Sequence, residues 1–300
     1  MNGAPDRITL LAFGLMVLFG GSNAVAVRFS HLELPPFWGA TIRFFAAALV
    51  FWVIVLARRI ELPKGRVLAA ILLYGFLAIG ANYAFLYWGL VRTPANLTMV
   101  VLAFVPLITF FLAVLHGLES FRWRGLIGAL IATAGITLGV AGGFSGQIHI
   151  PSILAVLAGA VCAAEGAVLF KLYVKGNPVA LNAVAITAGA TLLLLVSFLA
   201  GEAWSLPAAT NTWVAFAYLV LVGTVVVFYL ALFVLGRWTA SATSYSFLLF
   251  PVATVVISAW LLGEVVTIPF ILGGGLVVLG VWIGAIGSNS PQTTMRETAC

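Results

Sequence analysis

Ionisable and polar side chains placed inside long apolar runs are the residues of this chain with the clearest chemical potential. Glu165 is the only acidic residue well inside such a run, in the stretch Cys162-Ala-Ala-Glu165-Gly166. A carboxylate at that depth costs about 2.5 to 3.5 kcal/mol on insertion scales and is functional by default. Two interpretations stay open. Glu165 is a counter-ion for a cationic group or a proton carrier, or it is a structural residue that pairs with Lys171 or Arg43 or hydrogen-bonds to backbone as a neutral acid.

Arg43 lies inside the second apolar run, about two turns from its start. A guanidinium in that place would meet a substrate carboxylate. A long side chain so near a membrane interface also snorkels to lipid headgroups or pairs with a loop residue such as Glu33. We favour the structural role for Arg43 and keep the substrate-binding role as the alternative.

The third apolar run carries aromatic and amide side chains at mid-membrane depth: Asn82, Tyr83, Tyr87 and Trp88. Tyr83 and Tyr87 are four residues apart, so they lie on one face of a helix. They would form a stacking and cation–π wall for a ring-bearing or cationic substrate, or pack against neighbouring helices through ring and hydroxyl contacts. Four further polar or aromatic residues are candidates of the same kind: Asn23, Asn96, Met99 and Tyr245.

The elements that must position these residues are membrane-spanning helices. Of the 300 residues, 63% are hydrophobic and only 7% are charged, and the mean hydropathy is +1.20, which excludes a soluble globular chain. Apolar runs of about 20 residues, long enough to cross a bilayer, occur ten times. They span residues 8–27, 37–57, 67–91, 96–117, 123–143, 152–170, 179–200, 212–235, 241–262 and 268–286. We therefore predict an all-α polytopic membrane protein with ten transmembrane helices.

The basic residues define the orientation of these helices. With the N-terminus inside, only Arg28 and Arg92 of the 14 basic residues face outward, and Arg43 lies within a helix. The remaining basic residues fall on the cytoplasmic side: Arg7, Arg58, Arg59, Lys64, Arg66, Arg122, Arg124, Lys171, Lys175, Arg237 and Arg296. This bias predicts that both termini are cytoplasmic. The net charge of +6 thus indicates membrane topology and not nucleic-acid binding.

The chain repeats itself. A shift of 145 positions aligns Pro106 with Pro251, Glu119 with Glu264, Gly128 with Gly273, Gly135 with Gly280 and Gly139 with Gly284. We expect two five-helix units, residues 1–146 and 147–287, followed by a polar cytoplasmic tail, residues 288–300. Because five is odd, the second unit crosses the membrane in the opposite sense, and such inverted repeats operate by alternating access.

The duplicated residues carry further expectations. Pro106 and Pro251 should kink the fourth and ninth helices, either as gates or as static bends. Glu119 and Glu264 each precede the next helix, where a carboxylate caps free N–H groups, and we expect structural roles for them. The GxxxG pairs of the fifth and tenth helices should let these helices pack closely within one chain.

These patterns resemble the drug/metabolite transporter superfamily, specifically its ten-helix EamA-type branch. The resemblance rests on the doubled Pro, Glu and GxxxG pattern, on Gly20-Gly21-Ser22-Asn23 followed by Arg28, and on Arg43. It implies a multi-pass carrier of the bacterial inner (plasma) membrane that exports amino acids, other metabolites or toxic cations. Within the branch, the chain looks most like YddG-type exporters of aromatic amino acids and viologens. One departure is Glu165, which stands where the first copy has Ser22.

Other classes of function lack their central residues. The chain has one Asp, Asp6, and its histidines, His31, His116 and His149, stand alone near loops, so we expect no metal site, no cofactor and no enzyme activity. An intramembrane serine protease would rest on Ser145 in a loop outside the predicted bilayer, and a channel would need charge rings or filter loops. We expect a small-molecule substrate, contact with lipid and no nucleic acid, with a monomer as the first expectation and a homodimer as the alternative.

Overall fold

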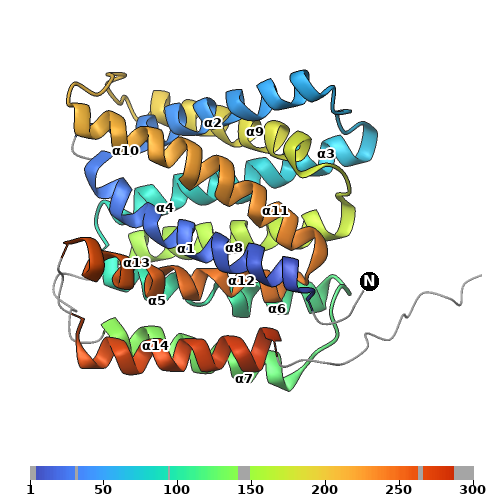
Figure 1. Cartoon of the computed structure of the whole chain (residues 1–300), viewed down its shortest axis with the longest axis vertical. Helices are drawn as coiled ribbons and strands as arrows, with labels where there is room; N and C mark the ends of the chain where they lie inside the picture. The colour runs from blue at the N-terminus through green and yellow to red at the C-terminus, as the bar shows by residue number, and fades with distance from the viewer. Residues whose placement is uncertain (1–4, 31–32, 94, 141–148, 263–265, 287–300) are drawn as a thin grey trace, which may run out of the picture.

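The computed structural model describes residues 5–30, 33–93, 95–140, 149–262 and 266–286, and in these ranges every regular element is a helix (Figure 1). Nine of the described helices are long and apolar enough to cross a membrane, and the described side chains of the first helix add a shorter apolar segment, Arg7–Asn23. The predicted all-α fold with ten spans is confirmed.

The first repeat forms spans one to five. Span three contains a π-helix, and span four is interrupted in its middle. The elements are α1 (Arg7–Ser30), α2 (Pro36–Arg58), α3 (Gly65–Tyr74), η1 (Gly75–Ala81), α4 (Asn82–Leu90), α5 (Ala95–Leu102), α6 (Val105–Leu115) and α7 (Trp123–Val140).

The second repeat forms spans six to ten with the same plan. Span eight again contains a π-helix, span nine is again interrupted, and span ten ends in a π-turn. The elements are α8 (Ile150–Tyr173), α9 (Pro178–Leu199), α10 (Thr210–Val220), η3 (Leu221–Val226), α11 (Val227–Arg237), α12 (Ala240–Ser244), α13 (Ser246–Leu262), α14 (Ile268–Val281) and η4 (Trp282–Ile286).

Helix starts follow the sequence signals closely. Pro36, Pro151, Pro178 and Pro269 occupy the first turn of α2, α8, α9 and α14. A proline costs little there because the N–H groups of the first turn have no partner within the helix. These prolines set where the helices begin.

The prolines inside the spans behave differently from each other. Span four breaks at Ala103 and Phe104, and Pro106 then sits in the first turn of α6. In span nine the break comes at Tyr245, and Pro251 lies inside the continuous helix α13. The duplicated proline therefore coincides with a helix break in the first repeat only, and the break in span nine lies six residues before Pro251.

The two repeats interlock through their first spans. α1 packs against α10, α11 and α13, which belong to spans eight and nine, whereas α8 packs against α3, η1, α4, α5 and α6 of spans three and four. Each repeat thus lays its first helix on the third and fourth spans of the other. The reciprocal exchange agrees with the predicted 5+5 repeat.

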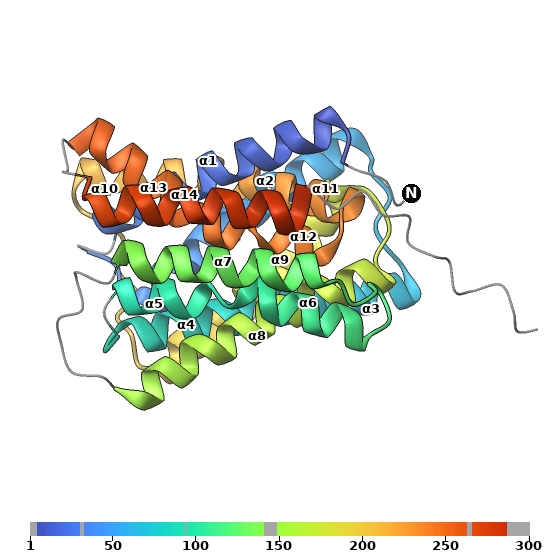
Figure 2. The same ribbon diagram turned by 90° about the horizontal axis from the view of Figure 1, so that it is seen from below.

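Two helix pairs form the edges of the bundle. α2 lies beside α9 along one edge, and α7 lies beside α14 along the other (Figures 1 and 2). In the second pair the backbones touch, because a Cβ atom on Gly135 would lie 2.5 Å from the carbonyl oxygen of Gly273. The glycine rows therefore join spans five and ten within one chain, as expected.

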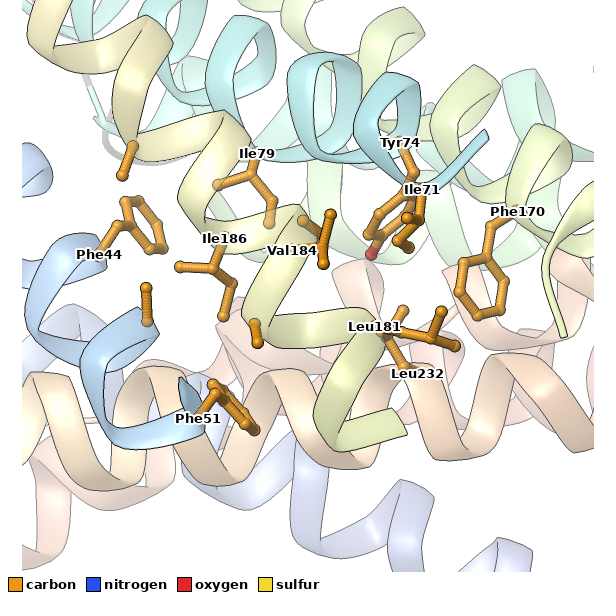
Figure 3. Close-up of a cluster of buried hydrophobic side chains, with 14 of the residues drawn as sticks. Phe44, Phe51, Ile71, Tyr74, Ile79, Phe170, Leu181, Val184, Ile186 and Leu232 are labelled. Carbon is orange, nitrogen blue, oxygen red and sulfur yellow. The ribbon is translucent and has the colours of Figure 1, made fainter. Parts of the chain in front are cut away.

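The largest apolar cluster lies on the side of the α2/α9 pair (Figure 3). Phe44 and Phe51 of α2 are fully buried there beside Ile186 of α9 and Ile71 of α3. This packing fixes α2, and with it the position of Arg43, against the second repeat.

Candidate functional site

Arg43 is a buried cation at a pocket. Its side chain lies on α2 and is only 4% exposed. The pocket is small and partly open to solvent, and is lined by Val27 of α1, Arg43, Tyr87 of α4, and Phe216 and Leu219 of α10. It lies toward the end of the bundle opposite Arg7, where the α1–α2 connection also contributes to its wall. Spans of both repeats meet at this pocket.

The π-helix of span eight holds Arg43 in place. The Nε atom donates a hydrogen bond to Thr224 Oγ1 at 2.7 Å, and Nη2 donates to the carbonyl oxygen of Gly223 at 3.0 Å. Gly223 and Thr224 belong to η3, and π-turns of this kind occur often at functional sites. The guanidinium also lies 5.4 Å from the ring centroid of Phe44. These two hydrogen bonds use two of the five guanidinium N–H groups.

No described carboxylate lies within 4.0 Å of Arg43. The expected partner Glu33 instead accepts hydrogen bonds from the backbone N–H groups of Ala208 and Ala209, at the start of α10. The predicted pair between Arg43 and Glu33 is therefore wrong, because the free N–H groups of a helix start bind that carboxylate. Arg43 keeps its charge without a described counter-ion.

Asn23 of α1 reaches the same carbonyl group as Arg43. Its Nδ2 donates to the Gly223 oxygen at 2.9 Å, while its Oδ1 is buried without a hydrogen-bond partner. A buried unsatisfied acceptor is costly and marks a site that a donor would complete. Spans one, two and eight thus converge on one backbone carbonyl.

Aromatic rings continue from Arg43 into span three. Phe44 meets Tyr83 edge to face, with ring centroids 4.9 Å apart, and Tyr83 meets Tyr87 at 5.8 Å. Phe228 of α11 also meets Phe44 edge to face, with ring centroids 5.7 Å apart. We call Phe228, Phe44, Tyr83 and Tyr87 the aromatic column. Its last member, Tyr87, lines the pocket beside Arg43.

The other aromatic and amide candidates lie elsewhere. Trp88 is 49% exposed and is not a member of the column. Tyr245 is buried, and its hydroxyl donates to the carbonyl oxygen of Gly125 in α7, so it joins spans nine and five. Asn82 is buried and donates to the carbonyl oxygen of Ala78 in η1, one turn earlier in span three.

Two candidates of span four do not join the described pocket. Met99 packs against the apolar cluster that includes Leu107 and Ile136. Asn96 belongs to α5, and its side chain lies outside the described part of the structure.

Two further residues named from the sequence, Ser145 and Glu264, lie outside the described residues altogether.

Glu165 has a partner that the sequence did not reveal. Its Oε1 lies 3.2 Å from Nε2 of His116, which follows the last residue of α6. The predicted pairs of Glu165 with Lys171 or Arg43 are wrong, and so is the interpretation of His116 as a histidine standing alone. His116 and Glu165 are 49 positions apart, and only the packing of α6 on α8 brings them together.

Two further charged side chains at that end of the bundle, Lys171 and Glu119, bind helix ends. Lys171 donates to the carbonyl oxygens of Leu235 and Gly236, at the C-terminal end of α11. Glu119 binds Arg122 at 3.1 Å and accepts hydrogen bonds from the backbone N–H and the hydroxyl of Ser241. The expected structural role of Glu119 is thus visible, but its carboxylate caps α12 of span nine and not the helix that follows it.

A family model identifies both halves of the chain. The model described as "EamA-like transporter family" matches residues 7–140 and again residues 150–285. A solved structure, titled only as a crystal structure of a protein, superposes with a TM-score of 0.81 at 22% identity and covers 95% of this chain and 100% of its own. That likeness concerns the fold alone.

Named relatives span most of the chain. An uncharacterized inner membrane transporter of Escherichia coli, YedA, is 27% identical over 92% of this chain and 89% of its own length. A probable terminal-alkyne amino-acid exporter of Streptantibioticus cattleyicolor is 31% identical over 74% of each chain.

Proposed function

Because the chain belongs to the EamA-like transporter family, we propose that it exports small amphipathic metabolites, chiefly amino acids with bulky or aromatic side chains, across the inner membrane. The match over both halves makes it a multi-pass membrane transporter. The family alone does not define the substrate, so we argue the substrate class from the residues at the pocket.

One observation supports a substrate with a carboxylate. Arg43 is a buried, permanently charged side chain at a pocket, without a described carboxylate beside it. A guanidinium stays protonated, and its fork of N–H groups matches a carboxylate. Three of its donors remain after the hydrogen bonds to Thr224 and Gly223. A substrate carboxylate would supply the missing negative charge.

The aromatic column suits the other end of such a substrate. Tyr87 lies at the pocket, and Tyr83 and Phe44 continue from it. Aromatic rings bury large apolar side chains and stack on rings at offset or edge-to-face geometry. An amino acid with a bulky apolar side chain would therefore satisfy both ends of the site.

The names of the relatives support the same proposal. One relative is named a probable exporter of a terminal-alkyne amino acid, and another an inner membrane transporter. The interlocked inverted repeats support a mechanism of alternating access, in which the site between them opens to each side of the membrane in turn.

Transport in proteoliposomes tests the proposal. We compare phenylalanine with phenethylamine, which has the same ring and amino group but no carboxylate. Wild-type protein should prefer phenylalanine, and Arg43→Gln should reduce that preference by about tenfold or more, since a hydrogen bond to a charged group contributes about 1.5 to 3 kcal/mol.

Two variants separate recognition from structure. Arg43→Lys keeps the charge and should keep part of the preference. Thr224→Val removes the hydroxyl that holds Nε and should leave the preference near that of the wild type. An unchanged preference in Arg43→Gln would contradict the proposal, and a wild-type preference for the amine would instead favour organic cations as substrates.

A further inference from the structure

The connection between α9 and α10, residues 200–209, binds the start of α2. We call this connection the strap, and it is the gold loop at the upper left of Figure 1. Glu202 of the strap accepts hydrogen bonds from the backbone N–H groups of Phe37, at 3.1 Å, and of Trp38, at 2.6 Å. The hydroxyl of Ser197 in α9 is a third donor, at 2.8 Å. A carboxylate of the second repeat thus binds free N–H groups at a helix start of the first.

The side chain of Trp38 adds two further contacts with the strap. Its Nε1 donates a hydrogen bond to the carbonyl oxygen of Ser205 at 2.7 Å. Its ring stacks on the ring of Trp204, with centroids 5.2 Å apart and an interplanar angle of 11°. Such ring pairs stabilise a contact beyond the area that they bury. The strap therefore holds both the backbone and a side chain in the first turn of α2.

A carboxylate of the first repeat binds the other end of the strap. Glu33, in the connection before α2, accepts hydrogen bonds from the backbone N–H groups of Ala208 at 3.0 Å and Ala209 at 3.2 Å. These two residues directly precede Thr210, the first residue of α10. Each repeat thus supplies one carboxylate to a helix start of the other, and the strap is bound at both of its ends.

The elements that the strap joins are walls of the pocket at Arg43. Leu34 and Ala40 line the pocket from the connection before α2 and from α2 itself, and Phe216 and Leu219 line it from α10. Leu34, Ala40 and Leu219 are buried, each at most 5% exposed. While the strap holds α2 against α10, these walls stay together and water scarcely reaches their side chains.

The equivalent connection of the first repeat is built differently. Aligning the first residues of α2 and α9 places Ile60 opposite Glu202, and the connection after α2 is shorter, residues 59–64. Ile60 packs against the largest apolar cluster. The start of α9 is capped from within its own repeat, because Asn177 Oδ1 accepts a hydrogen bond from the N–H group of Val179 at 2.9 Å. The strap is therefore a feature of one repeat and of the end of the bundle opposite Arg7.

We propose that the strap is the gate of the pocket at the end opposite Arg7, and that the pocket opens there when Glu33 and Glu202 release their N–H groups. Alternating access requires the contacts between the repeats to part at the end that opens. These hydrogen bonds cross between the repeats at the rim of the pocket, and water can replace either partner.

The gate acts on release of the substrate. The basic residues predict that the end opposite Arg7 faces outward, so an exported molecule would leave the pocket there. The inference rests on the proposed function in one respect, because it takes this pocket as the place of the substrate.

Labelling of a cysteine in the pocket tests the gate without any substrate. Ala40 is 2% exposed, so Ala40→Cys, with Cys162→Ala and Cys300→Ser removing the other thiols, reports how often the pocket opens. In detergent solution, a water-soluble maleimide should label this cysteine at least about fivefold faster in Glu202→Ala and in Glu33→Ala, because hydrogen bonds to a charged group favour the closed form. An unchanged rate in either variant would overturn the proposal.

Two controls separate a gate from a general loss of stability. Glu61→Ala removes an exposed carboxylate from the connection between spans two and three and should keep the wild-type rate. Native Cys162 of α8 is half-buried and does not line the pocket, so with Cys300→Ser as background it reports on the rest of the fold. Its labelling should change by less than about twofold in Glu202→Ala. An equal rise at Cys162 would mean that the variant loosens the whole bundle, and the proposal would then be wrong.

A reversible cross-link tests whether the strap must open during transport. Glu33→Cys with Ala208→Cys places two thiols where the carboxylate now meets an N–H group, in the background without Cys162 and Cys300. Bridging them with a bifunctional thiosulfonate should stop phenylalanine exchange in proteoliposomes, and reduction should restore it, while each single-cysteine variant keeps exchanging. Continued exchange by the bridged protein would exclude the strap as the gate. If the unbridged protein carries no phenylalanine, the proposed function fails, and the maleimide labelling still decides the gate.

Discussion

Arg43 illustrates how one side chain serves the fold and a candidate site together. Its Nε and Nη2 fasten span two to the π-helix of span eight, and its charge remains without a described acidic partner. The sequence placed Arg43 inside an apolar run but supplied the wrong partner for it. Partners were the least predictable feature at this scale, because a side chain reaches groups on helices that are distant in sequence.

The tyrosines of span three give a prediction at the same scale. Tyr87→Ala should raise the half-saturation concentration for phenylalanine about fivefold, because a ring pair contributes about 0.5 to 1.5 kcal/mol beyond its buried area. Trp88→Ala is the matched control, since this neighbouring ring is half exposed and does not line the pocket. Concentration-dependent uptake measures both, and equal values for Tyr87→Ala and the wild type would remove span three from the site.

At the scale of elements, helix ends and close backbone contacts join the repeats. Glu33 caps α10, Glu119 caps α12, and Glu202 accepts hydrogen bonds from the first N–H groups of α2. Each of these carboxylates belongs to the repeat opposite the helix that it caps. The sequence predicted a capping role for Glu119, but not which helix it reaches.

The contact between α7 and α14 leads to a stability prediction. A Cβ atom on Gly273 would collide with the backbone of Gly135, so Gly273→Ala should push the helices apart and cost about 1 to 3 kcal/mol. Gly275 lies on the same helix with nothing within 4 Å of its Cβ position, so Gly275→Ala should be neutral or slightly stabilising. Thermal unfolding in detergent compares the two variants, and equal midpoints would contradict this packing.

At the scale of the whole molecule, the reciprocal exchange of first spans determines how the protein can move. α1 and α8 each lie on the opposite repeat, so movement of one repeat carries along a helix that belongs to the other. Transporters built from inverted repeats operate by alternating access, so we expect two related arrangements, one open at each end. The pocket at Arg43 and the pair of His116 with Glu165 lie toward opposite ends of this bundle.

The orientation of the bundle is itself a prediction. The distribution of basic residues places both termini in the cytoplasm and the connection after span five outside. Alkaline phosphatase fused after Gly146 should be active, because it folds only outside the cytoplasm, whereas a fusion after Asp6 should be inactive. Activity of both fusions, or of neither, would exclude an odd number of spans between these points.

The sequence by itself determined the ten spans, the repeat and the depth of Arg43 and Glu165, because apolar length, proline and glycine positions and charge placement act locally along the chain. Only the tertiary structure decided that Arg43 binds Gly223, that Tyr87 reaches its pocket, and that His116 meets Glu165. These contacts join different spans, and in lipid apolar helices of similar hydrophobicity pack in many ways. Their mutual rotation is fixed by close packing of particular side chains, which no local pattern of the sequence records.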